Sequence, residues 1–420
     1  MEIHQDATIL DDAWKTSFGR PAGFAVDREI DSNTATAARM DNLDRYKELD
    51  RLYLDTRLLR SLARQEQQDY LRIMGQYKQT TSKIPIWLDC DPALELLGIS
   101  TVHGNASLQK CTNNALSVLE AIGKPEIPVV PGSSRPFCRT VDTASDIHGE
   151  SGLAGTSLLP QPSRRPLTHC SAVLEMRDAL LAQPKGTAYL VACGPLTNAA
   201  LLFSLFPDVA THIAGFSAMG GAIGSDFTHV SMGPPYLDSS GVSHERSGNK
   251  TPFAEFNIWA DPESARAVLQ NPVLQSKTTL IPLDLTHQAY ATPKVQNMLL
   301  NHGNPTRLRT MFNELLMFFA HTYAQVFGLK EGPPLHDPLA VAVLLDLHPD
   351  AEHKIAFDDK GGERWDVDVI LEGQQIGRTV ITPAPTGKGV RIPRALESEK
   401  FWHTLELCMN MADEATGFAM

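Results

Sequence analysis

From residue 84 to the C-terminus, short apolar runs alternate with segments whose apolar residues recur every three or four positions. Short runs of aliphatic and β-branched residues bounded by turn residues indicate buried strands, and the longer period indicates helices that cover a sheet. Their alternation predicts an α/β fold with a mainly parallel sheet flanked by helices. We predict strands at 84–89, 95–102, 127–130, 187–193, 212–219 and 278–283, and helices at 108–122, 171–182, 196–205, 262–270 and 306–327.

Several of these boundaries carry local signals. Asp261-Pro262-Glu263 combines a capping carboxylate, a proline at the first helical position and an acid in the first turn, so a helix should begin there. Gly123-Lys124-Pro125 should end another helix. Alternation within 365–382 predicts a late hairpin, and 394–411 predicts a terminal helix. The stretch 221–250, rich in Gly, Ser and Pro, is predicted to be a long loop, which in a compact domain is usually functional or disordered.

Residues 1–80 differ from the rest of the chain. Residues 44–79 are charged and rich in Gln, and their few leucines at helical spacing make a stripe too thin for a core. We therefore predict an N-terminal extension over 1–80, partly helical or disordered, followed by one domain over 84–420.

The composition narrows the class of protein. Hydrophobic residues make up 42% and charged residues 20%, which is typical of a globular domain with a sizeable core. The net charge of -12 argues against a nucleic-acid partner, which selects a basic face. No apolar run approaches the roughly 18 residues that span a bilayer, and the first residues lack the pattern of a signal peptide. The 6 cysteines form no Cys-x-x-Cys pair, which predicts reduced thiols and a cytoplasmic location.

Oxygen-rich clusters follow several of the predicted strands. Asp89 and Asp91 follow the first apolar run, His103-Gly104-Asn105 follows the second, and Glu255-Phe256-Asn257 and His336-Asp337 come later. Ligands of open α/β sheets bind outside the carboxyl ends of the strands, so we expect these clusters to form one site.

Each cluster taken alone has two interpretations. Asp89 and Asp91 would face the same side of a strand, and two converging carboxylates need a cation or a shared proton. Oxygen ligation suits Ca²⁺ or Mg²⁺, but the pair could also be a polar turn. Asp337 could be only a helix cap. Glu255 and Asn257, on one side of an extended backbone, could bind a polyol or be surface polar residues.

The clusters belong to a longer series of motifs along the chain. They are Asp89-Cys90-Asp91-Pro92, Thr101-Val102-His103-Gly104-Asn105, His148-Gly149-Glu150-Ser151-Gly152, Gly194-Pro195-Leu196-Thr197-Asn198, Ala254-Glu255-Phe256-Asn257, Asp284-Leu285-Thr286-His287 and His336-Asp337-Pro338. In order and approximate spacing, from residue 84 to the C-terminus, this series resembles the inosine/uridine-preferring nucleoside hydrolase family. The resemblance implies a Rossmann-like fold, bound Ca²⁺ and hydrolysis of the N-glycosidic bond of ribonucleosides.

The resemblance also implies roles for single residues. Asp91 matches the carboxylate that binds Ca²⁺ and takes a proton from the attacking water, and Asp89 supports it. Cys193, through its backbone carbonyl, and Asp337 match further metal ligands. His336 matches the acid for the departing base. The matched substrate contacts are Asn105, Asn249, Glu255 and Asn257 for the ribose and His148 near the base.

The chain departs from the family pattern after Pro92. The family continues Asp-x-Asp-Pro with Gly-x-Asp-Asp and a crossover helix, whereas here Ala93 and Leu94 already approach the second apolar run. One of the missing acids would bind metal and the other ribose. We therefore predict weakened Ca²⁺ binding and impaired hydrolysis of uridine- or inosine-type substrates. The alternative is a catalytically inactive family member that binds nucleosides or proteins, and a homo-oligomer is left open.

The shortened connection also bears on the sheet. Parallel neighbours usually need a connection of roughly a dozen residues, and Asp91 to Leu94 offers few. Either the chain is a truncated product, or strand 84–89 or strand 95–102 leaves its parallel place.

Overall fold

The computed structural model describes residues 84–87, 94–224, 226–347, 354–385 and 387–417, all within the unit Thr81–Met420. The predicted extension at 1–80, and the candidate residues Asp89 and Asp91, lie outside the described residues.

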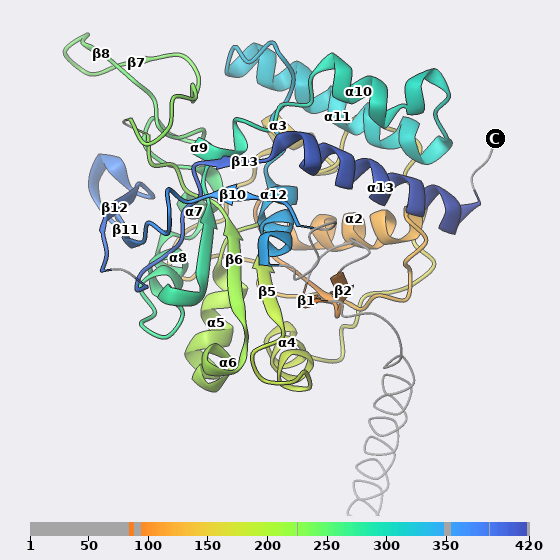
Figure 1. Cartoon of the computed structure of the whole chain (residues 1–420), viewed down its shortest axis with the longest axis horizontal. Coiled ribbons are helices and arrows are strands. Elements are labelled where there is room, and N and C mark those ends of the chain that lie inside the picture. The colour runs from red at the N-terminus through yellow and green to blue at the C-terminus, as the bar shows by residue number, and fades with distance from the viewer. Residues whose placement is uncertain (1–83, 88–93, 225, 348–353, 386, 418–420) are drawn as a thin grey trace, which may run out of the picture. The chain divides into compact units, whose positions relative to one another are not determined.

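Five parallel strands form the main sheet (Figure 1). Their order is β2 (Leu94–Leu96), β1 (Ile84–Trp87), β5 (Tyr189–Ala192), β6 (Gly215–Met219) and β9 (Thr278–Ile281). A separate parallel pair joins β3 (Ile99–Thr101) to β4 (Val129–Pro131). The predicted mainly parallel α/β fold is confirmed.

The predicted displacement is wrong for the first part of strand 95–102 and confirmed for its second part, β3, which lies outside the main sheet. β1 and β2 are parallel neighbours, with Ile84 opposite Leu94. Residues 88–93 connect them; a segment of that length reaches roughly 20 Å when extended, and a strand as short as β2 spans only about 10 Å. The predicted strand 95–102 instead breaks at Leu97-Gly98, and β3 pairs with β4 outside the main sheet.

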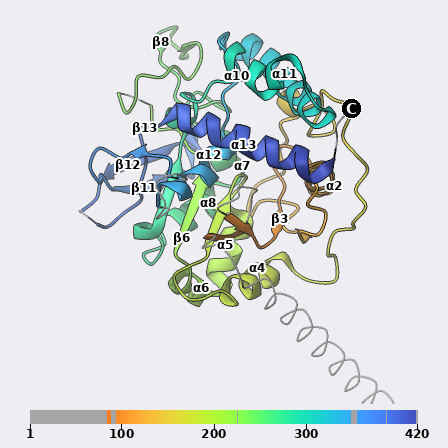
Figure 2. The ribbon, with the colours of Figure 1, turned by 45° about the vertical axis from the view of Figure 1, so that its right-hand side comes forward.

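Side chains alternate between the two faces of the sheet. Leu190, Phe216 and Leu280 belong to one hydrophobic core, and Val191 and Ile281 belong to the other. Helices cover both faces, and Figures 1 and 2 show α13 beside α10 and α11. The first core includes α4 (Ala172–Leu181), α5 (Thr197–Leu205) and α8 (Pro262–Leu269), and the second includes α10 (Pro293–Leu299), α11 (Arg307–Val326), α12 (Asp337–Ala342) and α13 (Ser398–Thr416).

The local signals place helix ends correctly. Asp261 caps α8 by accepting a hydrogen bond from the backbone N–H of Ser264 at 3.2 Å. α2 (Leu108–Ala121) ends before Gly123, whose φ of +72° suits a residue without a side chain. The other short helices are α3 (Ser145–His148), α6 (Pro207–His212), α7 (Phe256–Ala260) and α9 (Leu283–Thr286), with 3-10 turns at Gln275–Lys277, Asn301–Gly303, Val343–Leu347 and Gly373–Gln375.

The late hairpin is confirmed as β11 (Trp365–Val369) and β12 (Thr379–Pro383). The terminal helix begins later than predicted, at Ser398. The stretch 221–250 is not only loop, because it contains the hairpin of β7 (Tyr236–Leu237) and β8 (Ser243–His244). The remaining strands are β10 (Phe357–Asp358) and β13 (Ala395–Leu396), which pair with each other.

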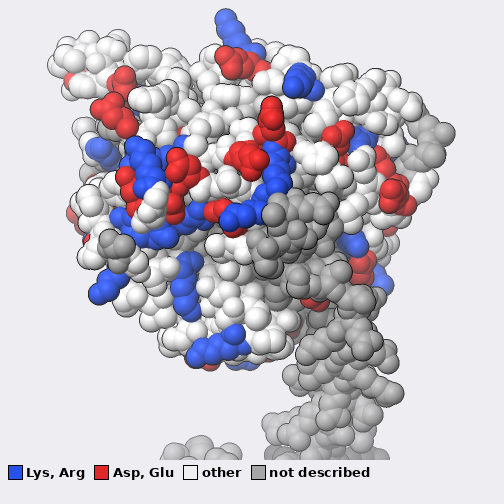
Figure 3. Space-filling view, in the orientation of Figure 1, with Lys and Arg blue, Asp and Glu red and all other residues white. Residues whose placement is uncertain are grey.

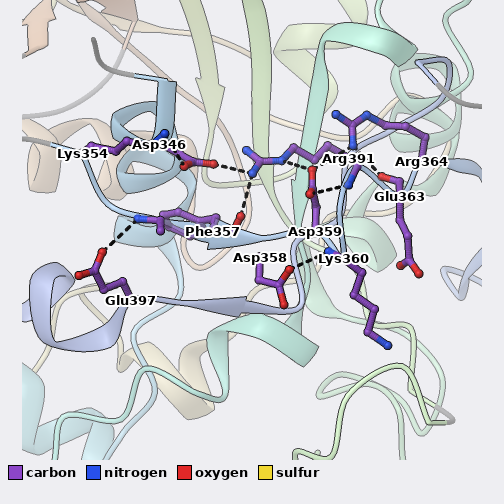
Figure 4. Close-up of polar contacts among 12 residues, drawn as sticks. Asp346, Lys354, Phe357, Asp358, Asp359, Lys360, Glu363, Arg364, Arg391 and Glu397 are labelled. Carbon is purple, nitrogen blue, oxygen red and sulfur yellow. Dashed lines mark hydrogen bonds and ion pairs between the residues drawn. The ribbon is translucent and has the colours of Figure 1, made fainter. Parts of the chain in front are cut away.

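An arginine network closes the outer edge of the sheet. The backbone of Arg391 pairs with β9, and its guanidinium contacts Asp346 at 2.5 Å and Asp359 at 3.0 Å (Figure 4). Figure 3 shows other basic and acidic side chains lying close together on the face in view. Covering the edge strand in this way removes a site for unwanted strand pairing.

Candidate active site

A cavity of about 420 Å³ lies where the carboxyl ends of β3 and β5 meet the start of α12. Asn105, Cys193 and Asp337, which are far apart in sequence, all line it. The expectation that the polar clusters converge at one edge of the sheet therefore holds for these three residues.

Cys193 and Asp337 are in contact. The thiol of Cys193 lies 3.7 Å from the backbone carbonyl oxygen of Asp337. The side-chain amide of Asn257 reaches the same place, donating to the carbonyl oxygens of Met219 at 3.2 Å and Cys193 at 3.5 Å. Three of the residues implied by the family resemblance thus form one connected group.

This group offers donors of the right kind for a hard cation but too few of them. The Asp337 carboxylate and the Cys193 carbonyl are oxygen donors, and Ca²⁺ takes about six to eight. Within the described part of the chain, no group of three or more His, Cys, Asp or Glu side chains could hold a metal. The remaining acids of the resemblance, Asp89 and Asp91, fall in the segment that is not described.

Glu255 has a different local structure from the one expected. The expectation of an extended backbone is wrong, because α7 begins at Phe256 and the Glu255 carboxylate caps it. The carboxylate accepts hydrogen bonds from the backbone N–H groups of Asn257 at 2.8 Å, Gly221 at 2.9 Å and Ile258 at 3.0 Å. Burial raises the pKa of Glu255 to about 7, because these three donors only partly offset desolvation.

Asn249 belongs to the same turn as Glu255. Its side-chain oxygen accepts a hydrogen bond from the backbone N–H of Phe256 at 3.0 Å. Next to it, the Lys250 ammonium lies 2.7 Å from the Asp142 carboxylate and 4.7 Å from the centre of the Trp259 ring. The turn is therefore tied to the loop that leads into α3.

His336 lies between two hydroxyl groups. Its Nδ1 atom is 2.7 Å from the Thr286 hydroxyl, and its Nε2 atom is 2.8 Å from the Tyr323 hydroxyl. Burial lowers the pKa of His336 well below its ordinary value, and the nearby His287 and His148 lower it further. The imidazole is consequently neutral near pH 7.

Tyr323 is the site residue that sequence reasoning missed. Burial raises the pKa of its hydroxyl, and the charges of Asp337 and Glu255 raise it further, so the hydroxyl keeps its proton. The usable signal was the spacing of Phe319 and Tyr323, one helical turn apart in α11. Phe319 meets the His148 ring edge-on at 5.1 Å between centroids, so the two aromatic residues face the two predicted histidines.

Comparisons with known proteins agree with this arrangement. The family description "Inosine-uridine preferring nucleoside hydrolase" matches residues 83–403. The uridine nucleosidase of Saccharomyces cerevisiae is 36% identical over 359 residues, covering 80% of this chain and 98% of that protein. A probable ribonucleoside hydrolase of Dictyostelium discoideum is 33% identical, covering 79% of this chain and 94% of that protein.

Solved structures show the same fold. The purine-preferring ribonucleoside hydrolase from Gardnerella vaginalis superimposes with a TM-score of 0.62 at 24% identity, covering 77% of this chain and 92% of that one. A plant nucleoside hydrolase gives a TM-score of 0.59 at 23% identity, covering 76% of this chain and 92% of that one. The family match over residues 83–403, together with these relatives, shows that the chain belongs to the inosine-uridine preferring nucleoside hydrolase family.

Proposed function

We propose that this chain catalyses hydrolysis of the N-glycosidic bond of ribonucleosides, releasing ribose and a free base. The observation that carries the proposal is the pairing of His336 with Tyr323 directly beside Asp337, which lines the cavity with Asn105 and Cys193. Departure of the base requires a group that donates a proton, and attack of water requires oxygen atoms that hold the water and take its proton.

The sugar side of the reaction needs stabilisation of positive charge. A ribosyl centre that loses its base becomes oxocarbenium-like, and nearby carboxylates and amide oxygens stabilise that charge. We assign this role to the residues grouped around the cavity and the adjoining turn. They are Asn105, Asn249, Glu255 and Asn257.

The base side needs a proton. A neutral imidazole between two hydroxyls can gain a proton on one nitrogen while losing one from the other, so it need not become a cation. We propose that His336 acts as the acid together with Tyr323: the Tyr323 hydroxyl passes its proton to the departing base and is reprotonated by the Nε2–H of His336. The Nδ1 atom of His336 takes its replacement proton through the Thr286 hydroxyl from solvent water, which in turn receives the proton that Asp91 removes from the attacking water. His148, at the end of α3 and against Phe319, would contact the base.

The water side depends on Asp91, which we propose as the general base, supported by Asp89. Asp91, Asp337 and the Cys193 carbonyl would hold Ca²⁺, which when bound lowers the pKa of a coordinated water. Because the family's Gly-x-Asp-Asp segment is missing after Pro92, we expect weak metal binding and a low rate. Cys111, Cys138 and Cys170 are free thiols, in keeping with the proposed cytoplasmic location.

A second candidate is an inactive family member that binds nucleosides. The observation that favours it is that the sequence lacks the Gly-x-Asp-Asp segment after Pro92, and with it two of the acids that the family resemblance implies. The two candidates share a binding site and differ only in turnover.

The test uses the full chain and a variant with a family-like Gly-x-Asp-Asp helix inserted after Pro92. Each is incubated with uridine, inosine and cytidine in the presence of Ca²⁺, and released base and ribose are measured separately. Base release by the unmodified chain, increased by the insertion and lost on His336→Ala substitution, supports the reaction. If the unmodified chain binds uridine but releases no base, the binding-only candidate is correct.

Within the described residues, no helix combines the length and apolar character needed to cross a bilayer.

A further inference from the structure

His103 is a buried histidine that the mechanism above does not use. It follows β3, is 1% exposed and lines the same cavity as Asn105 and Asp337. Its backbone N–H donates to the carbonyl of Ser133 at 3.0 Å. The next residue, Gly104, has a φ of +151°, and a Cβ there would lie 2.9 Å from the Pro195 ring, so the backbone beside His103 is tightly held.

A buried chain of hydrogen bonds leads from His103 to a carboxylate. The His103 Nε2 atom is 3.0 Å from the Thr197 hydroxyl, which donates to Asp261 Oδ2 at 2.6 Å. That carboxylate oxygen also receives the Ser264 hydroxyl at 2.6 Å and the backbone N–H of Phe137 at 3.1 Å. Asp261 is therefore surrounded by donors and acts only as an acceptor.

The hydrogen bonds from His103 through Thr197 to Asp261 determine which nitrogen of His103 carries its proton. A hydroxyl has one proton, and that of Thr197 goes to Asp261, so the Thr197 oxygen can only accept from His103. His103 must therefore donate through Nε2–H. Burial lowers the pKa of His103, which favours the neutral ring, and a neutral imidazole with Nε2–H has a bare lone pair on Nδ1.

The Nδ1 atom of His103 is buried and, among the described residues, has no hydrogen-bond partner. Native structures rarely leave a buried acceptor unsatisfied, because its lost hydration is not recovered. A lone pair pairs only with a donor, which excludes carbonyl and carboxylate oxygens. Because His103 lines the cavity, a donor group that reaches from the cavity into this wall is the candidate partner for Nδ1.

We propose that His103 Nδ1 is a ligand-binding atom that accepts a hydrogen bond from a sugar hydroxyl in this cavity, with Thr197 and Asp261 as positioning residues. The identification of the hydroxyl with that of a ribonucleoside rests on the proposed function. The proposal accounts for two residues with no assigned role, His103 beside Gly104-Asn105 and Thr197 within Gly194-Pro195-Leu196-Thr197-Asn198. The hydrogen bond between Thr197 and Asp261 determines the tautomer of His103. In that tautomer, Nδ1 can bind a ligand group that donates a hydrogen bond, such as a hydroxyl, but not a group that can only accept one.

The first test measures the tautomer directly in the free chain. Full-length protein labelled with ¹⁵N-histidine is studied by long-range ¹H–¹⁵N NMR, with the His103 signals identified by their loss in His103→Gln. We expect a protonated Nε2 and an unprotonated Nδ1. Titration with uridine, and separately with ribose, should move the Nδ1 signal in the direction of a hydrogen-bonded acceptor. A protonated Nδ1 in the free chain overturns the proposal whatever uridine does.

Two matched substitutions separate the two nitrogens. His103→Gln keeps a donor toward Thr197 but has no Nδ1 acceptor, whereas His103→Asn keeps a polar group near the Nδ1 position but cannot reach Thr197. Losing one ligand hydrogen bond should raise the uridine Kd about tenfold in His103→Gln with little change in melting temperature. His103→Asn should lower the melting temperature more and the affinity less. Parent-like uridine binding by folded His103→Gln overturns the proposal.

A third pair keeps the test decisive if the His103 variants do not fold. Thr197→Val removes the acceptor that holds Nε2–H, so the proton should redistribute to Nδ1 and uridine should bind more weakly. Thr197→Ser keeps the hydroxyl and should behave like the parent. An unchanged tautomer in Thr197→Val contradicts the relay.

These outcomes are distinct from those that decide the proposed function. Uridine that binds and moves the Nδ1 signal without being hydrolysed leaves the inference intact while the reaction fails. Uridine that is bound without a change at Nδ1 overturns the inference alone. If neither uridine nor ribose binds, both the substrate assignment and the hydroxyl contact are rejected.

Discussion

The two halves of the main sheet are held together differently. β6 pairs over four positions with each of β5 and β9, for example Tyr189 with Gly215 at the start of one ladder. Within the described residues, β1 pairs with β5 through Ile86 and Trp87 alone, and β3 pairs with β4 outside this sheet. The half that carries Cys193 is thus a regular ladder, whereas the half next to the altered segment is short and interrupted.

The interrupted half is joined to the regular half by a side chain. The amide of Asn198 donates to the Thr101 carbonyl at 2.9 Å, and its oxygen accepts from the Ser133 backbone N–H at 2.9 Å. Asn198 belongs to α5, so this one amide fixes the ends of β3 and β4 beside the cavity. The wall that carries Asn105 can therefore remain in place even though strand pairing there is reduced.

The largest effect that would test this contrast is restoration of the missing segment. Inserting a Gly-x-Asp-Asp helix after Pro92 should raise kcat/KM for uridine by roughly 10²–10³ for each transition-state contact regained. Asp91→Asn in the inserted chain should remove the gain. Initial rates of uracil release give the measurement. An unmodified chain that already works at ordinary enzymatic rates would show that the departure after Pro92 does not matter.

The affinity for Ca²⁺ should also depend on the difference between the regular half of the main sheet and the half beside the altered segment. The regular half supplies Asp337 and the Cys193 carbonyl, and affinity depends on the number and charge of the ligands. Calorimetry on the full chain should detect no tight Ca²⁺ binding, and the inserted chain should bind much more strongly. Submicromolar affinity in the unmodified chain would mean that another acid, such as Glu95, has taken the vacant ligand position.

The raised pKa of Glu255 predicts pH-dependent stability within the regular half. A carboxyl with a folded pKa of about 7 and an ordinary value of 4.5 favours the folded state when protonated. Its contribution is complete below the ordinary value and is lost as pH rises through about 7, by at most about 3 kcal/mol. Urea unfolding between pH 5 and 8 should show the loss. Glu255→Gln should flatten this dependence, and an equally steep profile in the variant would point to another group.

The bridging role of Asn198 can be compared with a single hydrogen bond in the regular half. Asn198→Ala removes two bonds and should reduce the free energy of unfolding by about 2–4 kcal/mol. Ser217→Ala removes one bond, to the Ala340 carbonyl at 2.7 Å, and should cost about 1 kcal/mol. Urea denaturation of both variants measures the difference. Equal losses would mean that the amide is not what holds β3 in place.

The sequence-based predictions were more accurate for the regular half of the main sheet than for the interrupted half. Periodicity located β5, β6 and β9 because both faces of these strands are buried by helices, which leaves a strong apolar signal. The convergence of Asn105, Cys193 and Asp337 was predictable because parallel strands end at one edge.

The failures of those predictions have local and tertiary causes. The break at Leu97-Gly98 and the capping role of Glu255 depend on which backbone groups need a hydrogen-bond partner. The pattern of apolar residues in the sequence contains no information about this. The contacts that give Tyr323 and Thr197 their roles are made with partners distant in sequence, His336 for the one and His103 for the other.

The smallest expected effect concerns the ion pair between Asp142 and Lys250, which ties the loop before α3 to the turn that carries Asn249. Both side chains are partly exposed, at 41% and 27%, so the pair should contribute less than about 1 kcal/mol to stability. Lys250→Met keeps the apolar stem over Trp259 but loses the charge. In the inserted chain we expect uridine KM to rise about two- to fivefold with kcat nearly unchanged, because only the positioning of the loop is loosened.

Salt provides an independent check on that pair. High ionic strength should reproduce the Lys250→Met effect in the parent and add little in the variant, since the screened interaction is already absent there. Lys250→Arg keeps the charge and serves as the matched control. A fall in kcat with unchanged KM would instead place the loop in the chemical step, so that the interrupted half of the molecule would contribute to turnover and not only to binding.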